Sequence, residues 1–415
     1  MRLTPALLKH AEAALTDLLQ LTGPADDLLS RYFREHRELG QQERAFVAET
    51  VFGVVRRKRS LEAAAGSSQP QALLAAALMR LHGLSARALE GLVDSSLAAR
   101  IRGARGEELP AAVRADLPDW LWERLAADYG DAEAMRIAQG MLNPAPLDLR
   151  VNLARTSRDA VLEQFARDGI DAAPTAHSPA GIRLAGKPAI NRYPLFTDGL
   201  IEVQDEGSQL LAWLVAPRRG EMVADYCAGA GGKTLALAML MRGAGRLYAL
   251  DVSAKRLGAL APRAARAGIS NVHSVVLSGD NDARARRLAG KMDRVLVDAP
   301  CSGFGTLRRN PDLKWRQGPQ AIDELAAKQL RILRAAAPLV KGGGRLVYAT
   351  CSLLREENEA IADAFAAAHA QFDEVSCADL LGSQRIELEG ERLRLWPHRH
   401  GTDGFFAAAF VRRAG

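Results

Sequence analysis

Two cysteines at the ends of apolar, strand-like segments are the first candidates for chemistry. The run RVLVDAPCS (294–302) leads into Cys301, and the run RLVYATCS (345–352) leads into Cys351. Open α/β sheets bind ligands at the carboxyl ends of their strands, so both thiols are expected at such an edge. A single free cysteine is more often a small buried hydrophobe than a nucleophile. Two cysteines at one edge, one of them close to Asp298, favour a reactive site.

A glycine-rich turn is the second chemical signal. The segment VADYCAGAGGKT (223–234) follows an apolar run and precedes a helical pattern, so its glycines would let the backbone approach a ligand closely. Asp251 ends the next apolar run, where a carboxylate can reach a ribose diol. The turn is not GxGxxG, and Cys227 occupies the first glycine position of a P-loop. The combination predicts an adenosine-containing cofactor, with Asp280 or Asp282 near its adenine.

Several chemistries could use these thiols. A metal site is disfavoured because the chain has no Cys-x-x-Cys pair and its His–Cys spacing is irregular. A redox pair is an alternative, although no other feature resembles a thioredoxin unit. One reaction requires a thiol, a carboxylate and an adenosine cofactor together. A thiolate adds to carbon 6 of a cytosine while a carboxyl group holds N3, and carbon 5 then attacks the methyl group of S-adenosylmethionine.

Hydrophobic periodicity predicts the elements that carry these residues. Residues 1–142 have Ala and Leu at three- and four-residue spacing, which indicates an all-helical domain. A proline-bearing linker leads to a small α+β subdomain at 143–205. Strands and helices then alternate over 206–415, which predicts a doubly wound α/β domain. Its buried parallel strands are expected at the near-continuous apolar runs 222–226, 246–250, 272–277, 292–297 and 344–349.

Composition and charge limit the classes of protein. The 415 residues are 48% hydrophobic and 25% charged, and no apolar run is long enough to span a membrane. Four cysteines do not make a disulfide framework, so a cytoplasmic location is expected. The net charge is +6, yet residues 1–142 hold 18 Lys and Arg against 19 Asp and Glu. Any nucleic-acid surface is therefore expected on the remaining chain, and the basic cluster 56–59 is interpreted as a solvated helix end.

Taken together, the motifs resemble those of the Sun/Fmu-type bacterial RNA cytosine-5 methyltransferases, particularly their RsmB-like branch. The matching segments occur in family order over about 200 residues: VQDEGSQL (203–210), DYCAGAGGKT (225–234), VDAPCSGFGTLRRNPDLKW (297–315), YATCSLLREENE (348–359) and DGFFAAAF (403–410). Residues 29–57 also resemble the NusB-like helical domain of that branch. The resemblance implies a Rossmann-like methyltransferase sheet, an α+β subdomain facing RNA, and S-adenosylmethionine as cofactor without a metal.

The resemblance also implies roles for individual residues. Cys351 would add to carbon 6, Cys301 would help to release the methylated product, and Asp298 would lie against both the cytosine and the cofactor. The cofactor turn would comprise Cys227, Ala228, Gly229, Ala230, Gly231, Gly232 and Lys233, with Asp251 on the ribose and Asp280 near the adenine. Lys233 could instead point towards the catalytic carboxylate. Ala230 departs from the family's usual proline and frees a φ angle that proline would lock.

The substrate side is predicted from the basic segment after Cys301. Arg308, Arg309, Lys314, Trp315 and Arg316 would contact phosphates and stack on an unstacked base, unless the tryptophan is core and the arginines are solvated. The resemblance favours small-subunit rRNA as the partner of a monomeric enzyme, with tRNA as the runner-up and no obligate protein partner. Two alternatives stay open: a DNA cytosine-5 methyltransferase with Cys301 as nucleophile, and a non-enzymatic RNA-binding assembly factor.

Overall fold

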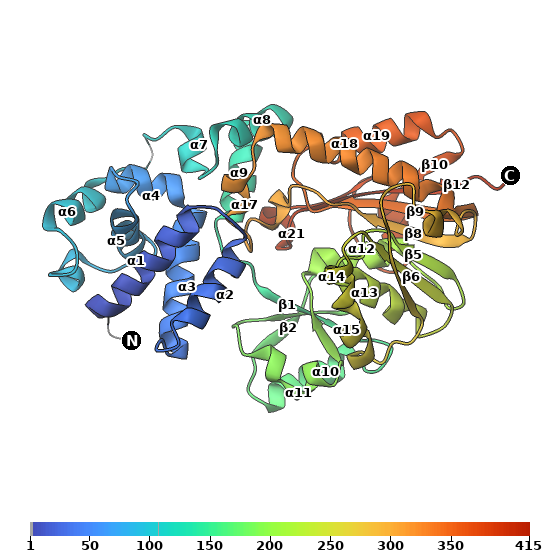
Figure 1. The fold of residues 1–415 in the computed structure, drawn as a ribbon, viewed down its shortest axis with the longest axis horizontal. Coiled ribbons are helices and arrows are strands. Elements are labelled where there is room, and N and C mark those ends of the chain that lie inside the picture. Colours follow the sequence, from blue (N-terminus) through green and yellow to red (C-terminus); the bar gives the residue numbers. More distant parts are fainter. Residues whose placement is uncertain (1–2, 107) are drawn as a thin grey trace. The chain divides into compact units, whose positions relative to one another are not determined.

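The computed structural model describes residues 3–106 and 108–415 (Figure 1). The chain divides into two compact units. One unit contains the residues up to Pro144 together with Thr306–Pro319, and the other contains Ala145–Gly305 and Gln320–Gly415. Among the described residues, none of the helices combines the length and the apolarity that a membrane crossing requires.

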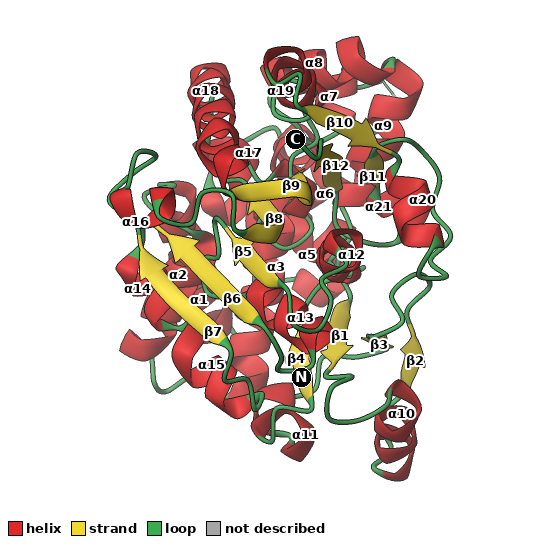
Figure 2. Ribbon diagram, turned by 90° about the vertical axis from the view of Figure 1, so that its right-hand side faces the viewer, coloured by secondary structure: helices red, strands yellow, loops and turns green. Residues whose placement is uncertain are grey.

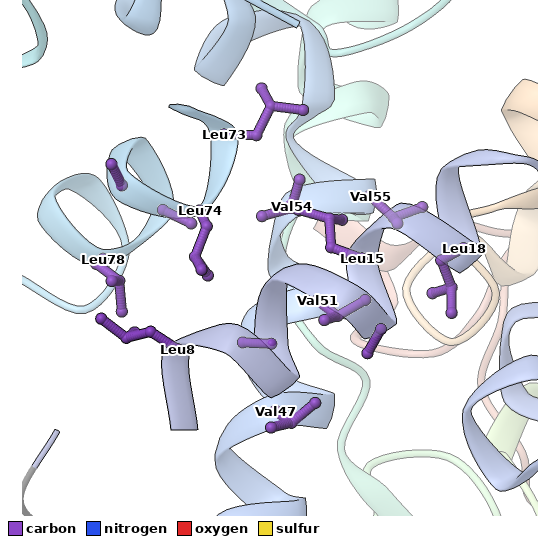
Figure 3. Close-up of a cluster of buried hydrophobic side chains, with 14 of the residues drawn as sticks. Leu8, Leu15, Leu18, Val47, Val51, Val54, Val55, Leu73, Leu74 and Leu78 are labelled. Atoms are coloured by element: carbon purple, nitrogen blue, oxygen red, sulfur yellow. The ribbon is translucent and has the colours of Figure 1, made fainter. Parts of the chain in front are cut away.

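The first unit is helical, as its Ala–Leu periodicity predicts. Its helices are α1 (Pro5–Leu19), α2 (Ala25–Glu35), α3 (Gln41–Arg56), α4 (Lys58–Ala65), α5 (Pro70–Arg80), α6 (Ser95–Gly103), α7 (Ala111–Arg114), α8 (Asp119–Tyr129) and α9 (Asp131–Met141). The Thr4 hydroxyl caps α1 by accepting the Leu7 N–H at 3.2 Å. Helices α1, α3 and α5 bring Leu15, Val51 and Leu73 into a common apolar core (Figure 3).

The helical unit also includes a segment that the sequence assigns to the catalytic domain. Residues 306–319 group with the helices, and their short helix α17 (Leu313–Arg316) is bonded to the end of α3. Asp312 accepts the N–H of Ala25 at the start of α2 at 3.4 Å. The expected continuous domain 206–415 is therefore interrupted between Gly305 and Gln320. Hydrophobic periodicity could not predict this excursion, because the segment is short and polar.

The small subdomain is an antiparallel sheet in the order β2-β3-β1-β4. Its strands are β1 (Leu147–Val151), β2 (Ala172–Pro174), β3 (Gly181–Leu184) and β4 (Ile201–Val203), and its helices are α10 (Arg158–Arg167) and α11 (Pro194–Thr197). Ser157 caps α10 through the Ala160 N–H. Phe165 of α10 packs on Leu149 and Ile182 of the sheet, which closes a separate apolar core.

The large sheet has the order β10-β12-β9-β8-β5-β6-β7, with β11 paired to β12. Its strands are β5 (Met222–Asp225), β6 (Arg246–Asp251), β7 (Val272–Val276), β8 (Met292–Asp298), β9 (Val340–Thr350), β10 (Phe372–Val375), β11 (Leu393–Leu395) and β12 (Phe405–Arg412). Figure 2 shows β5, β6 and β7 as neighbouring arrows. Strands β7, β6, β5, β8 and β9 are parallel, whereas β12 is antiparallel to β9.

Helices provide apolar residues on both faces of this sheet, which confirms the doubly wound α/β prediction. They are α12 (Glu206–Val215), α13 (Gly232–Met241), α14 (Ala254–Gly258), α15 (Leu260–Arg266), α16 (Ala283–Arg286), α18 (Pro319–Ala336), α19 (Glu359–Ala368), α20 (Cys377–Gly382) and α21 (Pro397–His400). Successive strand residues enter different cores: Val223 packs with α12 and α13, and Ala224 packs with α18 and α19. This two-sided burial explains why the central strands are almost continuously apolar. Strand β7, at the edge of the sheet, has no buried residue and is not the buried strand that the sequence predicts at 272–277.

The connections place a ligand crevice at the centre of the sheet. The chain runs from β5 outward to β6 and β7, and then returns to β8 on the other side of β5. The connection that leaves β5 and the connection that leaves β8 therefore run in opposite directions beyond the carboxyl ends of these two strands. Such a switch point is where open α/β sheets bind ligands.

Candidate active site

A cavity of about 430 Å³ occupies this switch point. Its lining comes from the carboxyl ends of five parallel strands and from the segments that follow them. These are the glycine-rich turn after β5, Asp251 at the end of β6, Asp280 after β7, Asp298 at the end of β8 with Cys301 beyond it, and Cys351 after β9. The tertiary structure thus brings the predicted catalytic and cofactor-binding residues together in one cavity. Gly231 is the predicted member that does not line it.

The glycine-rich turn needs glycine at two positions for different reasons. Gly229 has φ +55° and Gly231 has φ +86°, in the left-handed region that favours glycine. A Cβ on Gly231 would lie 2.2 Å from Leu260 Cδ1, whereas one on Gly229 would lie 3.9 Å from Arg256 Nη1. Gly231 therefore permits the turn to pack on α15, and Gly229 leaves open space beside the cavity. The carbonyl of Ala230 accepts a bond from Arg263 at 2.5 Å, which restrains the turn where proline is missing.

Asp251 ties the turn to the next strand. Its carboxylate accepts the Gly229 N–H at 2.8 Å and the Ser253 N–H at 2.7 Å. The exposed guanidinium of Arg256 also lies 3.2 Å from both carboxylate oxygens. A ribose diol bound here would compete with this exposed side chain rather than with the backbone bonds. The position predicted for a ribose contact is therefore structurally suited to that role.

The two acids after β7 have different environments. Asp282 caps α16 and accepts bonds from the Arg284 side chain and from the Ser278 N–H, which hold the pKa of its carboxyl far below the usual range. Asp280 lines the cavity and has an exposed ion pair with Arg331 at 3.4 Å. Of the two acids left open by the sequence, Asp280 is the one that can face a ligand.

The two thiols contact each other. Cys301 Sγ lies 3.4 Å from Cys351 Sγ, and both cysteines are free. The contact with Cys351, burial and the charge of Glu357 raise the pKa of the Cys301 thiol well above its ordinary value. Burial and the nearby Asp298 carboxylate also raise the pKa of Cys227. Cys301 and Cys227 are thus held as protonated thiols near neutral pH.

Lys233 reaches across the cavity to the predicted catalytic acid. Its Nζ donates to Asp298 Oδ2 at 2.7 Å, which confirms the alternative orientation towards the carboxylate. Burial alone would lower the pKa of Lys233, but the charge and hydrogen bond of Asp298, helped by Cys351, raise it overall. Behind this pair, burial raises the pKa of Asp225 to about 7, and Asp225 accepts the Thr234 hydroxyl at 2.7 Å. The cavity therefore holds a fixed ammonium beside a carboxylate and two thiols.

The predicted RNA-contacting segment requires a correction. Lys314 is only 2% exposed and donates to the Arg56 carbonyl at 2.8 Å, and Arg308 is also buried. The Trp315 indole N–H donates to the Val55 carbonyl at 2.8 Å, and its ring packs against the helical core. These three side chains stabilise the helical unit instead of presenting a surface to RNA. Arg309 and Arg316 are more accessible, although Arg316 has an ion pair with Asp312.

The basic cluster 56–59 is not the solvated helix end that the sequence predicts. Arg56 is buried and donates to the Arg308 carbonyl at 3.0 Å. Arg57 donates to the Leu142 carbonyl, and Arg59 donates to the Leu117 carbonyl and to Asp119. The cluster therefore satisfies carbonyl groups inside the helical unit. A charge count could not show this, because the carbonyl partners are distant in sequence.

Sequence reasoning missed three residues that shape the site. Gln204 lines the cavity, and buried Arg150 of β1 bonds to Gln204 and donates to the Gly232 carbonyl at 3.0 Å. This contact joins the small subdomain to the glycine-rich turn. Glu357 is completely buried beside the two thiol loops. The matched segments 203–210 and 348–359 contain Gln204 and Glu357, but only the fold showed what they contact.

This combination of features defines the class of protein. A doubly wound sheet has a glycine-rich turn and a strand-end acid on one side of its switch point, and two contacting thiols with an acid on the other side. The first set suits a nucleoside cofactor and the second suits covalent chemistry on a substrate. The fold and site are those of a Rossmann-like methyltransferase.

Comparison with known proteins identifies the family. Residues 212–411 match the family described as 16S rRNA methyltransferase RsmB/F, and residues 117–191 match the ferredoxin-like domain described for RsmF/B-like methyltransferases. The probable ribosomal RNA small subunit methyltransferase B of Synechocystis sp. is 33% identical, over 95% of this chain and 96% of that protein. The Bacillus subtilis protein of the same description is 32% identical, over 93% and 94%.

A solved structure shares the fold. The crystal structure of PH0851 aligns with 99% of this chain and 99% of that chain, at a TM-score of 0.78 and 26% identity. The chain belongs to the RsmB/F methyltransferase family.

Proposed function

We propose that this protein is an S-adenosylmethionine-dependent RNA cytosine-5 methyltransferase that acts on small-subunit rRNA. The observation that carries the proposal is the 3.4 Å contact between Cys301 and Cys351 at the cavity that Asp298 also lines. Family membership and the names of the relatives support methylation of small-subunit rRNA. The thiol pair supports cytosine carbon 5 as the target, because that carbon needs covalent activation.

The cavity residues fit the cofactor. The turn from Cys227 to Lys233 offers a backbone that a ligand can approach, with open space beside Gly229. Asp251 would hold the ribose and Asp280 would lie near the adenine, while Asp298 would border the reacting end. When bound, the cofactor would supply an electrophilic methyl group.

The chain's own residues would activate the cytosine. The Cys351 thiolate would form a bond to carbon 6, which makes carbon 5 nucleophilic. A proton shared between Asp298 and N3 would stabilise the negative charge that develops on the ring. Lys233, 2.7 Å from Asp298, would keep that carboxyl oriented. After methylation, the carbon 5 proton passes to solvent, the electrons of the sulfur–carbon bond return to the Cys351 sulfur, and the ring becomes aromatic again.

Cys301 would act in this last phase. Its raised pKa keeps it protonated, so it can donate to the departing Cys351 sulfur, which lies 3.4 Å away. The target base must leave its stack to reach the thiols, so an exposed loop or incompletely assembled rRNA is the expected substrate. Arg309 and Arg316 remain proposed contacts to its phosphates.

Radiolabel transfer tests the proposal. The protein is incubated with methyl-tritiated S-adenosylmethionine and unmodified small-subunit rRNA, and the RNA is digested to nucleosides. Label in 5-methylcytidine is the expected result, with tRNA and duplex DNA as parallel substrates. Label at another nucleoside, or in no nucleic acid, would contradict the proposal. Preference for tRNA or DNA would retain the chemistry but overturn the proposed substrate.

A further inference from the structure

Glu357 is a buried carboxylate that the reaction above does not use. It lies between β9 and α19, and none of its surface is exposed. Burying a carboxylate is costly unless hydrogen bonds compensate it. Its Oε1 accepts the Ser302 N–H and the Gln329 side-chain amide, each at 2.8 Å. Its Oε2 accepts the Ser302 hydroxyl at 2.5 Å and also the Ser352 hydroxyl.

Two of the groups that donate to Glu357 are serines next to the two cysteines in the chain. Ser302 immediately follows Cys301, and Ser352 immediately follows Cys351. Their hydroxyl oxygens lie 3.2 Å apart, and both hydroxyls donate to the same carboxylate oxygen. One side chain therefore joins the loop after β8 to the loop after β9. Hydrogen bonds to a charged acceptor are shorter and stronger than neutral ones, so this link is rigid.

Neighbouring bonds fix Glu357 itself. The Tyr348 hydroxyl donates to the Glu357 carbonyl at 2.5 Å. The Gln329 amide, from α18, also donates to the Pro300 carbonyl at 3.1 Å, on the other side of Cys301. Asn358 donates to the Ser352 carbonyl at 3.1 Å. Both thiol loops are thus held by the pair Glu357–Asn358 and by α18.

We propose that Glu357 is a positioning residue that holds Cys301 and Cys351 in contact. The reason for this contact rests on the proposed function, in which the Cys301 thiol must reach the Cys351 sulfur while that sulfur is bonded to the base. The geometric part does not depend on that function. Without the link, the two loops remain joined by their strands and by the Gly305 N–H, which donates to the Cys351 carbonyl at 2.8 Å, and the distance between the sulfurs becomes more variable.

The contact between the thiols can be measured without any methyl transfer. Reduced protein is equilibrated with oxidised glutathione, which takes two electrons and two protons from Cys301 and Cys351 and becomes two molecules of glutathione. The fraction of disulfide, read by peptide mass spectrometry, gives the effective concentration of one thiol at the other. The variant is Glu357→Gln, which keeps the shape and removes the charge. The matched control is Glu359→Gln, since Glu359 pairs with Arg394 and touches neither thiol loop.

The expected result is a drop of about tenfold in effective concentration for Glu357→Gln, because charge-assisted hydrogen bonds become neutral ones. Glu359→Gln should match the wild type. In methylation assays, Glu357→Gln should lower kcat while the Kd for S-adenosylmethionine stays unchanged, because Glu357 does not line the cavity. Ser352→Ala, which removes one donor, should give a smaller drop of about threefold and serves if Glu357→Gln does not fold.

Two outcomes overturn the inference. In the first, the wild type forms no disulfide between Cys301 and Cys351. In the second, Ser352→Ala, and also Glu357→Gln if it folds, have the same effective thiol concentration as the wild type. These outcomes are separate from failure of the proposed function, which would appear as absent 5-methylcytidine in the wild-type assay. A wild type that makes no 5-methylcytidine but shows the tenfold difference would retain the positioning role and reject the reaction.

Discussion

Cys301 and Cys351 are 50 residues apart in the chain, and their sulfur atoms are 3.4 Å apart in the fold. The register of two neighbouring parallel strands produces this contact. Asp298 at the end of β8 pairs with Ala349 of β9, so each cysteine lies two or three residues beyond a paired position. The two loops then leave the same edge of the sheet side by side, and Glu357 joins them.

Single alanine variants of the cysteines should separate attack from release. Cys351→Ala is expected to abolish methylation, because the proposed reaction assigns the bond to carbon 6 to the Cys351 sulfur. Cys301→Ala should methylate once and retain the RNA as a covalent adduct that withstands denaturation, visible as a shifted band on a denaturing gel. A trapped adduct in Cys351→Ala together with an inactive Cys301→Ala would reverse the assigned roles.

The pKa of Cys301 should respond to removal of its neighbour. The hydrogen bond with Cys351 is the largest cause of the raised pKa, ahead of burial. Cys351→Ala should therefore move the alkylation midpoint of Cys301 down towards the ordinary thiol range. Iodoacetamide labelling across pH, followed by mass spectrometry, measures the midpoint. Cys377, whose pKa burial raises to about 11, is an internal control that should not change.

Asp251 should determine cofactor affinity. Asp251→Asn removes the charge that orders the turn through the Gly229 N–H and that would hold the ribose. The Kd for S-adenosylmethionine, measured by calorimetry, is expected to rise about tenfold or more. Asp282→Asn is the matched control, because Asp282 caps α16 and does not line the cavity. Equal affinities in the two variants would contradict the assigned ribose site.

The two left-handed glycines of the turn should differ in their tolerance of alanine. Gly229→Ala introduces only the backbone strain of φ +55°, which costs about 1 kcal/mol. Gly231→Ala adds a Cβ 2.2 Å from Leu260 Cδ1, so overpacking should raise the loss to about 2–4 kcal/mol. Urea unfolding without cofactor provides the comparison. Equal losses would mean that α15 shifts freely away from the turn.

Buried Lys314 should make stability depend on pH. Burial lowers the pKa of Lys314 to about 7 from its ordinary 10.5. Between these values the unfolded chain binds a proton that the folded chain does not, so stability should rise with pH from about 7 to 10. The Lys314→Met variant lacks this proton. Its stability relative to the wild type should therefore fall by up to about 1.4 kcal/mol per pH unit in urea titrations at pH 7, 8 and 9. A constant difference would mean that Lys314 is charged in the fold.

The sequence predicted the strands of the large sheet and the placement of most candidate site residues at its edge, because both depend on local sequence patterns. Near-continuous apolar runs predicted the strands β5 to β9 within a few residues, and the parallel arrangement followed from the alternation with helices. Parallel strands end at one edge, so Cys301, Cys351, Asp251 and the glycine-rich turn could be placed together before the fold was known. The sequence left two directions open for the Lys233 side chain, towards the cofactor or towards the carboxylate, because the direction depends on partners across the cavity.

Only the tertiary structure decided which polar residues are available and which are structural. Lys314 and Trp315 follow the candidate site residue Cys301 in sequence, but their segment packs into the helical unit, where Val55 and Arg56 offer carbonyl groups. Glu357 is one of several acids in REENE, and three of its four donors come from two distant segments, at Ser302 and at Gln329. Burial and hydrogen-bond partners between distant residues leave no periodic signal in the chain. They arise only when the elements pack, and here they separate the residues that would act on RNA from those that hold the site in place.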